Sequence, residues 1–249
     1  MAAETIRGKV FFAWLATAAL ALVIAVGTGF AQSQSQAPPA KGAAPGINDS
    51  WKSPDTKPLV ERLETESREI YHERMNLAEL VAPKPGTSVA DVGAGSGFMT
   101  LLFAQMVGPK GKVYAVDINP AMMKVVAQRA REEGLANVQT VVTREDSVDL
   151  PANSTDLVFI CDTYHHFENP QGSLAGIYRA LKPGGQVVVV EFDRIPGKTP
   201  QWILDHVRAG QEEVTKEITA AGFELVQALH PEFLSENYLL RFRKIQKKN

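Results

Sequence analysis

The sequence predicts an α/β domain built on a mostly parallel β-sheet with helices on both faces. Short apolar segments alternate with longer segments of helical periodicity over residues 88–192, which is typical of parallel strands joined by crossover helices. The last two strand-like segments, 223–228 and 238–242, have no helical segment between them. We therefore expect these two segments to form an antiparallel hairpin at the edge of the sheet.

The order of elements follows from hydrophobic spacing and turn residues. Apolar residues recur at roughly helical spacing between Leu59 and Leu80, and the turn residues 83–86 end that segment. Strands are expected at 88–92, 112–116, 138–142, 156–161 and 186–192. Helices are expected at 97–107, 120–133, 169–181 and 211–221. The second of these begins with a proline and is followed by Gly134, the usual asymmetry of helix ends.

Composition restricts the classes of function. The chain has 249 residues, 45% of them hydrophobic and 22% charged, with a formal net charge of −2 and a pI near 6.2. This balance does not favour a nucleic-acid partner, because nucleic-acid binders usually concentrate basic residues. The single cysteine, Cys161, excludes a disulfide within the chain and a cysteine-rich metal site.

The first 31 residues have the layout of an export signal. Arg7 and Lys9 precede an uncharged apolar stretch that ends in small residues, so cleavage before Gln32 is expected. The stretch 10–30 is also long enough to cross a bilayer, and an uncleaved anchor in contact with the membrane is the alternative. In either case the positive start predicts that the rest of the chain faces outward, as a periplasmic, extracellular or outward-facing anchored protein.

The sequence divides into three parts. Residues 1–31 form the predicted signal or anchor. Residues 32–56 are rich in Gln, Ser, Ala, Pro and Gly and are predicted to be a disordered linker. Residues 57–249 form the predicted globular domain.

A glycine-rich loop lies between the first strand and its helix, at Asp91-Val92-Gly93-Ala94-Gly95-Ser96-Gly97. Small residues at the carboxyl end of a strand let a nucleotide-like ligand approach the backbone, and the helix N-terminus offers free N–H groups. Asp117 ends the second strand, where a carboxylate can accept both hydroxyls of a ribose. Together these residues predict a cofactor site.

Two cofactor classes use such a loop. The dinucleotide fingerprint spaces its glycines as G-x-G-x-x-G, whereas here Phe98 stands at the last position and would crowd the close contact that the third glycine permits. The order D-x-G-x-G-x-G instead matches loops that bind S-adenosylmethionine (SAM). The spacing therefore disfavours a nicotinamide cofactor and favours SAM.

Three motifs together resemble the class I SAM-dependent methyltransferases, closest to the branch with quinone-biosynthesis and small-molecule enzymes. They are the loop 91–97, the second strand 113–118 and the segment 179–185. The resemblance covers residues 77–242 and implies a Rossmann-like sheet of seven strands, the last antiparallel, with SAM as cofactor and a small-molecule methyl acceptor.

The resemblance also implies roles for individual residues. Asp91 and the glycine loop would hold the methionine part of SAM, Asp117 the ribose, and Ile118 would pack on the adenine. Asp146 matches the position that bonds the adenine amino group, with Glu145 as the alternative. The full cofactor set is Asp91, Gly93, Ala94, Gly95, Gly97, Asp117, Ile118 and Asp146.

The acceptor is expected beside the loop 162–167, which follows the fourth strand. A histidine can act as a general base near neutral pH, so His166 and, less favoured, His165 are candidates for a base or for acceptor positioning. Asp162 and Tyr164 are candidate positioning groups. We expect no metal site, because adjacent histidines point in different directions and no carboxylate partner is obvious in the sequence.

Methyl transfer from a sulfonium is a direct displacement, so alignment of the reactants can supply much of the rate. The leading hypothesis is a SAM-dependent small-molecule methyltransferase. The alternatives are a nicotinamide-dependent Rossmann oxidoreductase and a non-catalytic SAM-binding module.

Overall fold

The computed structural model describes residues 42–246. The predicted signal or anchor, residues 1–31, and the first part of the predicted linker lie outside the described residues. Within residues 42–246, no helix combines the length and apolar character needed to cross a membrane.

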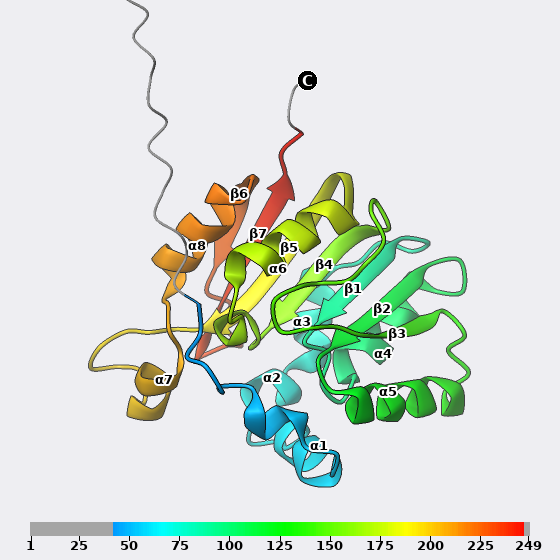
Figure 1. Ribbon diagram of the computed structural model, residues 1–249, viewed down its shortest axis with the longest axis horizontal. Coiled ribbons are helices and arrows are strands. Elements are labelled where there is room, and N and C mark those ends of the chain that lie inside the picture. Colours follow the sequence, from blue (N-terminus) through cyan, green and yellow to red (C-terminus); the bar gives the residue numbers. More distant parts are fainter. Residues whose placement is uncertain (1–41, 247–249) are drawn as a thin grey trace, which may run out of the picture. The chain divides into compact units, whose positions relative to one another are not determined.

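A seven-stranded sheet organises the described part of the chain (Figure 1), in the order β3-β2-β1-β4-β5-β7-β6. Its strands are β1 (Ser88–Val92), β2 (Lys112–Asp117), β3 (Val138–Val142), β4 (Thr155–Cys161), β5 (Leu181–Phe192), β6 (Phe223–Leu229) and β7 (Asn237–Lys244). The first five pair in parallel, whereas β7 pairs antiparallel with both β5 and β6. The predicted mostly parallel sheet with an antiparallel C-terminal hairpin is confirmed.

Helices cover both faces of this sheet. They are α1 (Lys57–Leu63), α2 (Glu69–His72), α3 (Arg74–Val81), α4 (Phe98–Val107), α5 (Pro120–Glu132), α6 (Pro170–Ala180), α7 (Gln201–His206) and α8 (Gln211–Ala220), with the short 3₁₀ turns η1 (Asp49–Lys52) and η2 (Tyr164–His166). Because alternate residues of a strand point to opposite faces, Val158 and Ile160 pack with α6 and α8. Phe159 packs with α3 and α4 on the other face.

The segment of roughly helical spacing before the sheet does not form one continuous helix. It is broken into α1, α2 and α3. The break precedes α2 at Arg68, whose backbone is extended and whose side chain binds Asp162 at a Nη2–Oδ2 distance of 2.7 Å. The helix is therefore interrupted between Leu63 and Glu69, where Arg68 forms this long-range ion pair.

Residues 42–56 also differ from the disordered linker that their composition predicts. The amide of Ala43 donates to the carbonyl of Phe167 over 2.9 Å, and the Asn119 side chain donates to the carbonyls of Trp51 and Ser53 at 2.7 and 2.9 Å. One backbone hydrogen bond and the side chain of Asn119, which caps the start of α5, therefore attach this segment to the domain, despite its low apolar content.

Candidate functional site

A cleft opens at the carboxyl ends of β1, β2 and β4, where an open α/β sheet receives its ligands. Its walls are the glycine loop after β1, the end of β2, the loop 143–148, the loop 161–167 and parts of the segments 48–51 and 63–68. The space between these walls, open mouth included, is about 1050 Å³, which is enough for a nucleoside-sized ligand. The predicted cofactor residues that line it are Asp91, Gly93, Ala94, Gly95, Asp117 and Ile118.

The glycine loop exposes its backbone to the cleft because side chains do not fit there. Gly93 has a φ of 77°, and a Cβ on it would lie 2.3 Å from the side chain of Thr163. The amides of Gly93 and Ala94 both donate to the carbonyl of Val116, at 2.8 and 3.1 Å. These bonds fix the loop against β2.

Gly97 serves packing, and it does not line the cleft. A Cβ at Gly97 would lie 2.7 Å from Cγ2 of Val126, so this glycine lets α5 approach the start of α4. The third glycine of the motif therefore contributes to the packing of α4 and α5, and contributes to the cleft only indirectly.

Asp117 joins the end of β2 to the glycine loop. Its carboxylate accepts from the amide of Gly95 at 2.9 Å and from the amide of Asn119 at 2.8 Å. Burial raises the pKa of Asp117, against the lowering effect of these amides. Each carboxylate oxygen has a second lone pair, so this group can still accept hydrogen bonds from a ligand in the cleft.

Asp91 is buried at the base of the cleft, with 3% of its surface exposed. Its carboxylate accepts from the Thr100 hydroxyl at 2.6 Å. Burial, with the nearby charge of Asp117, raises the pKa of Asp91 to about 7, although the Thr100 hydrogen bond opposes the shift. A cationic ligand group placed here would favour the ionised carboxylate.

The loop after β3 contributes Glu145 to the cleft wall, and the Asp146 side chain lies outside it. Asp146 is exposed and accepts from the Nε of Arg144 at 3.2 Å. Glu145 pairs instead with Lys52, which belongs to the segment predicted to be a linker. Of the two candidates for contact with the adenine amino group, Glu145 is therefore the one that lines the cleft.

Asp162 lines the cleft but is already engaged on both oxygens. It accepts from Arg68 at 2.7 Å and from the side chain of Asn237 at 2.7 Å. Its φ of 46° is a conformation that an aspartate tolerates better than most residues. Asp162 thus connects the end of β4 with α2 and the start of β7.

Tyr164 lies away from the cleft, contrary to its predicted positioning role. It is fully buried, and its hydroxyl lies 2.8 Å from Oε2 of Glu217. Arg208 binds the same carboxylate through two nitrogens, at 2.7 and 2.8 Å. Tyr164 is therefore part of a buried polar cluster that attaches η2 to α8.

The two adjacent histidines have different surroundings. His165 is buried, and its Nδ1 lies 2.9 Å from both oxygens of Glu191. Burial lowers the pKa of His165, but the Glu191 carboxylate outweighs this and the net shift is upward. His166 lines the cleft, and burial together with the neighbouring histidines lowers its pKa to about 3.

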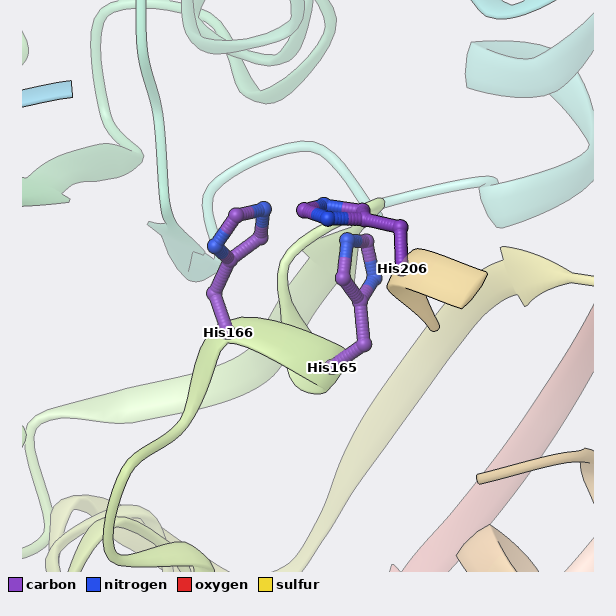
Figure 2. A group of neighbouring side chains, drawn as sticks. All are labelled: His165, His166 and His206. Atoms are coloured by element: carbon purple, nitrogen blue, oxygen red, sulfur yellow. The ribbon is translucent and has the colours of Figure 1, made fainter. Parts of the chain in front are cut away.

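Both reasons for expecting no metal site are contradicted by the structure. The rings of His165 and His166 reach the same space, where His206 of α7 joins them (Figure 2). Glu191 is a carboxylate partner that the sequence does not reveal, because it lies 26 residues from His165. The helix α7 itself was not among the predicted elements.

The structure adds cleft residues that the sequence did not indicate: Asn48, Trp51 and Arg68. The first two lie in the segment predicted to be a linker. Arg68 lies in a segment where only the apolar residues form a pattern, and that pattern predicts helix but no binding site. No motif or spacing marks these positions. They reach the cleft only through long-range contacts.

A model of the ubiE/COQ5 methyltransferase family matches residues 66–206, which is more than half of the chain. Among similar curated proteins, the ubiquinone/menaquinone biosynthesis C-methyltransferase UbiE of Hydrogenovibrio crunogenus is 39% identical over 118 residues, covering 47% of this chain and 46% of that protein. The UbiE of Ectopseudomonas mendocina is 38% identical over 120 residues, covering 48% and 46%. The chain spans about half the length of the curated relatives it matches.

Solved structures share the fold. A SAM-dependent methyltransferase from Aquifex aeolicus superposes with a TM-score of 0.66 and 25% identity, over 77% of this chain and 99% of that one. The [4+2]-cyclase SpnF superposes with a TM-score of 0.68 over 84% of this chain and 99% of that one, at 17% identity, which concerns the fold alone. With the family match over residues 66–206, the chain belongs to the ubiE/COQ5 methyltransferase family.

Proposed function

We propose that this chain binds SAM in the cleft beside β1, β2 and β4 and transfers its methyl group to a small-molecule acceptor. The observation that carries the proposal is the convergence of Asp91, the glycine loop and Asp117 on one cleft. When bound, SAM supplies an electrophilic methyl group on a sulfonium. Family membership makes this chemistry the first expectation for the site.

The residues of the cleft fit the parts of SAM. Gly93 and Gly95 line the cleft without side chains, so the backbone of this loop can approach the methionine part closely. Asp91 offers a carboxylate to the ammonium group, and Asp117 retains acceptor capacity for the ribose hydroxyls. For the adenine amino group we propose Glu145, since its side chain lines the cleft.

For the acceptor side, His166 is the histidine that lines the cleft. A pKa of about 3 makes its neutral imidazole a weak base, because the efficiency of a general base rises with its pKa. We therefore propose that His166 positions the acceptor and that alignment supplies most of the rate. This site suits an acceptor whose carbon is nucleophilic enough to attack the methyl group before a strong base removes a proton from it.

The names of the UbiE relatives describe C-methylation in ubiquinone and menaquinone biosynthesis. Electron-rich aromatic or quinol-type compounds are therefore the first acceptors to test. Fold alone does not determine the reaction, since the similar SpnF is described as a cyclase. The alternatives are a nicotinamide-dependent oxidoreductase and a SAM-binding module without turnover.

Calorimetric titration of the purified chain with SAM and, separately, with NADH tests the proposal. We expect SAM to bind and NADH not to bind. Incubation with SAM and a panel of quinol-type acceptors should then produce S-adenosylhomocysteine. Tight NADH binding without SAM binding would refute the proposal, and SAM binding without turnover on the true acceptor would favour the binding module.

We also propose that the domain acts outside the cytoplasm, directed there by residues 1–31, which act either as a cleaved signal or as an uncleaved anchor. The support is the sequence pattern of Arg7 and Lys9 before the apolar stretch. A reporter that is active only after export should work when fused after Gln32. N-terminal sequencing of the mature protein would distinguish cleavage from anchoring, and a reporter active only inside would refute the orientation.

A further inference from the structure

Three of the chain's five histidines meet beside the cleft (Figure 2). His165 and His166 belong to η2, and His206 is the last residue of α7, 40 residues further along the chain. Each offers a ring nitrogen, and these three atoms lie within 4.8 Å of one another. The ring centroids are 4.3, 5.0 and 5.1 Å apart. Two separate elements thus direct three imidazoles into one small space.

Two of these histidines have an oxygen acceptor beside Nδ1. Nδ1 of His165 lies 2.9 Å from both carboxylate oxygens of Glu191, which is 1% exposed. Nδ1 of His166 lies 3.1 Å from Oδ1 of Asn48. Metal-binding histidines usually donate their other N–H to a carboxylate or carbonyl oxygen, which fixes the tautomer and orients the ring. In both rings Nδ1 is engaged, so Nε2 is the nitrogen that can bind a metal ion.

Glu191 is itself held in place. One of its oxygens accepts from the amide of His165 at 3.2 Å, and the other accepts from the amide of Phe192 at 3.2 Å. A buried carboxylate fixed by two amides and one imidazole strongly orients that imidazole. A packing role for His165 would not require this arrangement of acceptors.

We propose that His165, His166 and His206 bind a divalent transition-metal ion such as Zn²⁺. Neutral imidazole is a preferred ligand of zinc, and three protein ligands with an open fourth position are typical of reactive zinc sites. The proposal does not depend on SAM binding.

At most a small closure brings the site to metal-ligand distances. Zn–N bonds of about 2.0–2.1 Å place tetrahedral nitrogens roughly 3.4 Å apart, and the three nitrogens here already lie within 4.8 Å of one another. His206 is partly exposed at the end of a short helix, whereas His165 is buried, so a rotation of the His206 side chain is the least costly adjustment. Because His166 also lines the cleft, the fourth position would be available to water or to an oxygen of a cleft ligand. With its Nδ1 beside Asn48 and its Nε2 on the metal, His166 would then position the acceptor through the metal and not by direct contact.

Metal titration of the full-length chain, purified without a histidine tag and treated with a chelator, tests the proposal. We expect about one equivalent of Zn²⁺ to bind, and Co²⁺ to give the intense visible absorption of a tetrahedral site. His206→Ala should weaken Zn²⁺ binding at least about 100-fold, because it removes one of three ligands. Glu191→Gln should weaken it by about 10–100-fold, as for other groups that support a metal-binding histidine.

The matched control is His72→Ala. His72 is an exposed histidine on α2 outside the cluster, and this variant should bind Zn²⁺ like the parent. Circular dichroism on each variant confirms folding, and the Co²⁺ spectrum of the parent tests the site without any substitution. Absence of Zn²⁺ binding and of the Co²⁺ bands in the parent, or equal affinity in His206→Ala and the parent, would overturn the proposal.

Discussion

At the scale of single residues, the cleft is built from carboxylates that also hold the backbone. Asp117 fixes the amides of Gly95 and Asn119, so its side chain shapes the loop before any ligand arrives. Asp91 is held in a similar way by the hydroxyl of Thr100. Their replacement is therefore expected to alter both the shape and the charge of the site.

Asp117→Ala should weaken SAM binding by roughly 1.5–3 kcal/mol, the range for hydrogen bonds to a charged group. The matched control is Asp146→Ala, because Asp146 is an exposed aspartate outside the cleft wall and its loss should leave the affinity unchanged. Isothermal calorimetry on both variants measures the difference. Equal losses of affinity would show that the ribose site is placed wrongly.

Asp91 should make stability depend on pH. Its pKa is raised from an ordinary value of 3.8 to about 7 by burial, so the folded state binds the proton more tightly than the unfolded chain. The resulting stabilisation is complete below about pH 4 and is lost as the pH rises to about 7.

Asp91→Asn keeps an oxygen for the Thr100 hydroxyl but removes this titration. Between pH 4 and 7 the free energy of unfolding of the parent should fall by roughly 1–4 kcal/mol more than that of the variant. Urea unfolding at several pH values measures both curves, and other titrating groups contribute equally to each. Parallel pH profiles would contradict the raised pKa.

At the scale of elements, buried polar clusters connect segments that are distant in sequence. Glu217 on α8 accepts from Arg208, and the Tyr164 hydroxyl of η2 contacts the same carboxylate. Asp162 similarly connects the end of β4 to α2 and β7. These clusters fix the loop 162–167, and with it the side of the cleft where we propose that the acceptor binds.

Arg208→Met should destabilise the protein by about 3–5 kcal/mol, because it leaves the buried carboxylate of Glu217 without its cation. The control is Arg243→Met, which breaks the exposed pair of Arg243 with Glu224 and should cost at most about 1 kcal/mol. Thermal or urea unfolding compares the two variants. A similar small loss in both would mean that the buried cluster contributes little.

At the scale of the whole molecule, local signals predicted the sheet well. Apolar strand segments and the proline and glycine residues between them predicted β1 to β4 and the hairpin of β6 and β7 within two residues, whereas β5 begins five residues before its predicted start. The glycine loop and Asp117 were predictable for the same reason, since each stands at a fixed offset from a strand. The sequence therefore predicts those strands and site residues that depend on a local pattern.

Contacts between distant segments were not predictable. Asn48 bonds His166 across 118 positions, and Arg68 bonds Asp162 across 94. Neither residue belongs to a periodic or spaced pattern, so the sequence gives no reason to place it at the cleft. The three-histidine cluster was missed likewise, because His206 lies on a short helix with no clear periodicity.

Residues 42–56 allow a test of such long-range contacts. Their low apolar content predicted disorder, whereas the structure attaches them to the cleft. A chain that begins at residue 42 should bind SAM, whereas one that begins at Ser53 loses Asn48 and Trp51 from the cleft wall. The shorter chain also loses the hydrogen bonds from Asn48 to the carbonyl of His166 and from Asn119 to the carbonyl of Trp51.

We expect the shorter chain to bind SAM about 10-fold or more weakly and to unfold at lower temperature, because two neutral hydrogen bonds of about 1 kcal/mol each are removed together with a packed tryptophan. Calorimetry and thermal unfolding of the two chains measure both effects. The full-length chain containing Trp51→Ala is the control, since it removes the ring but keeps the backbone acceptor of Asn119. Equal affinity and equal unfolding temperature in the two truncated chains would show that residues 42–52 do not contribute to the site.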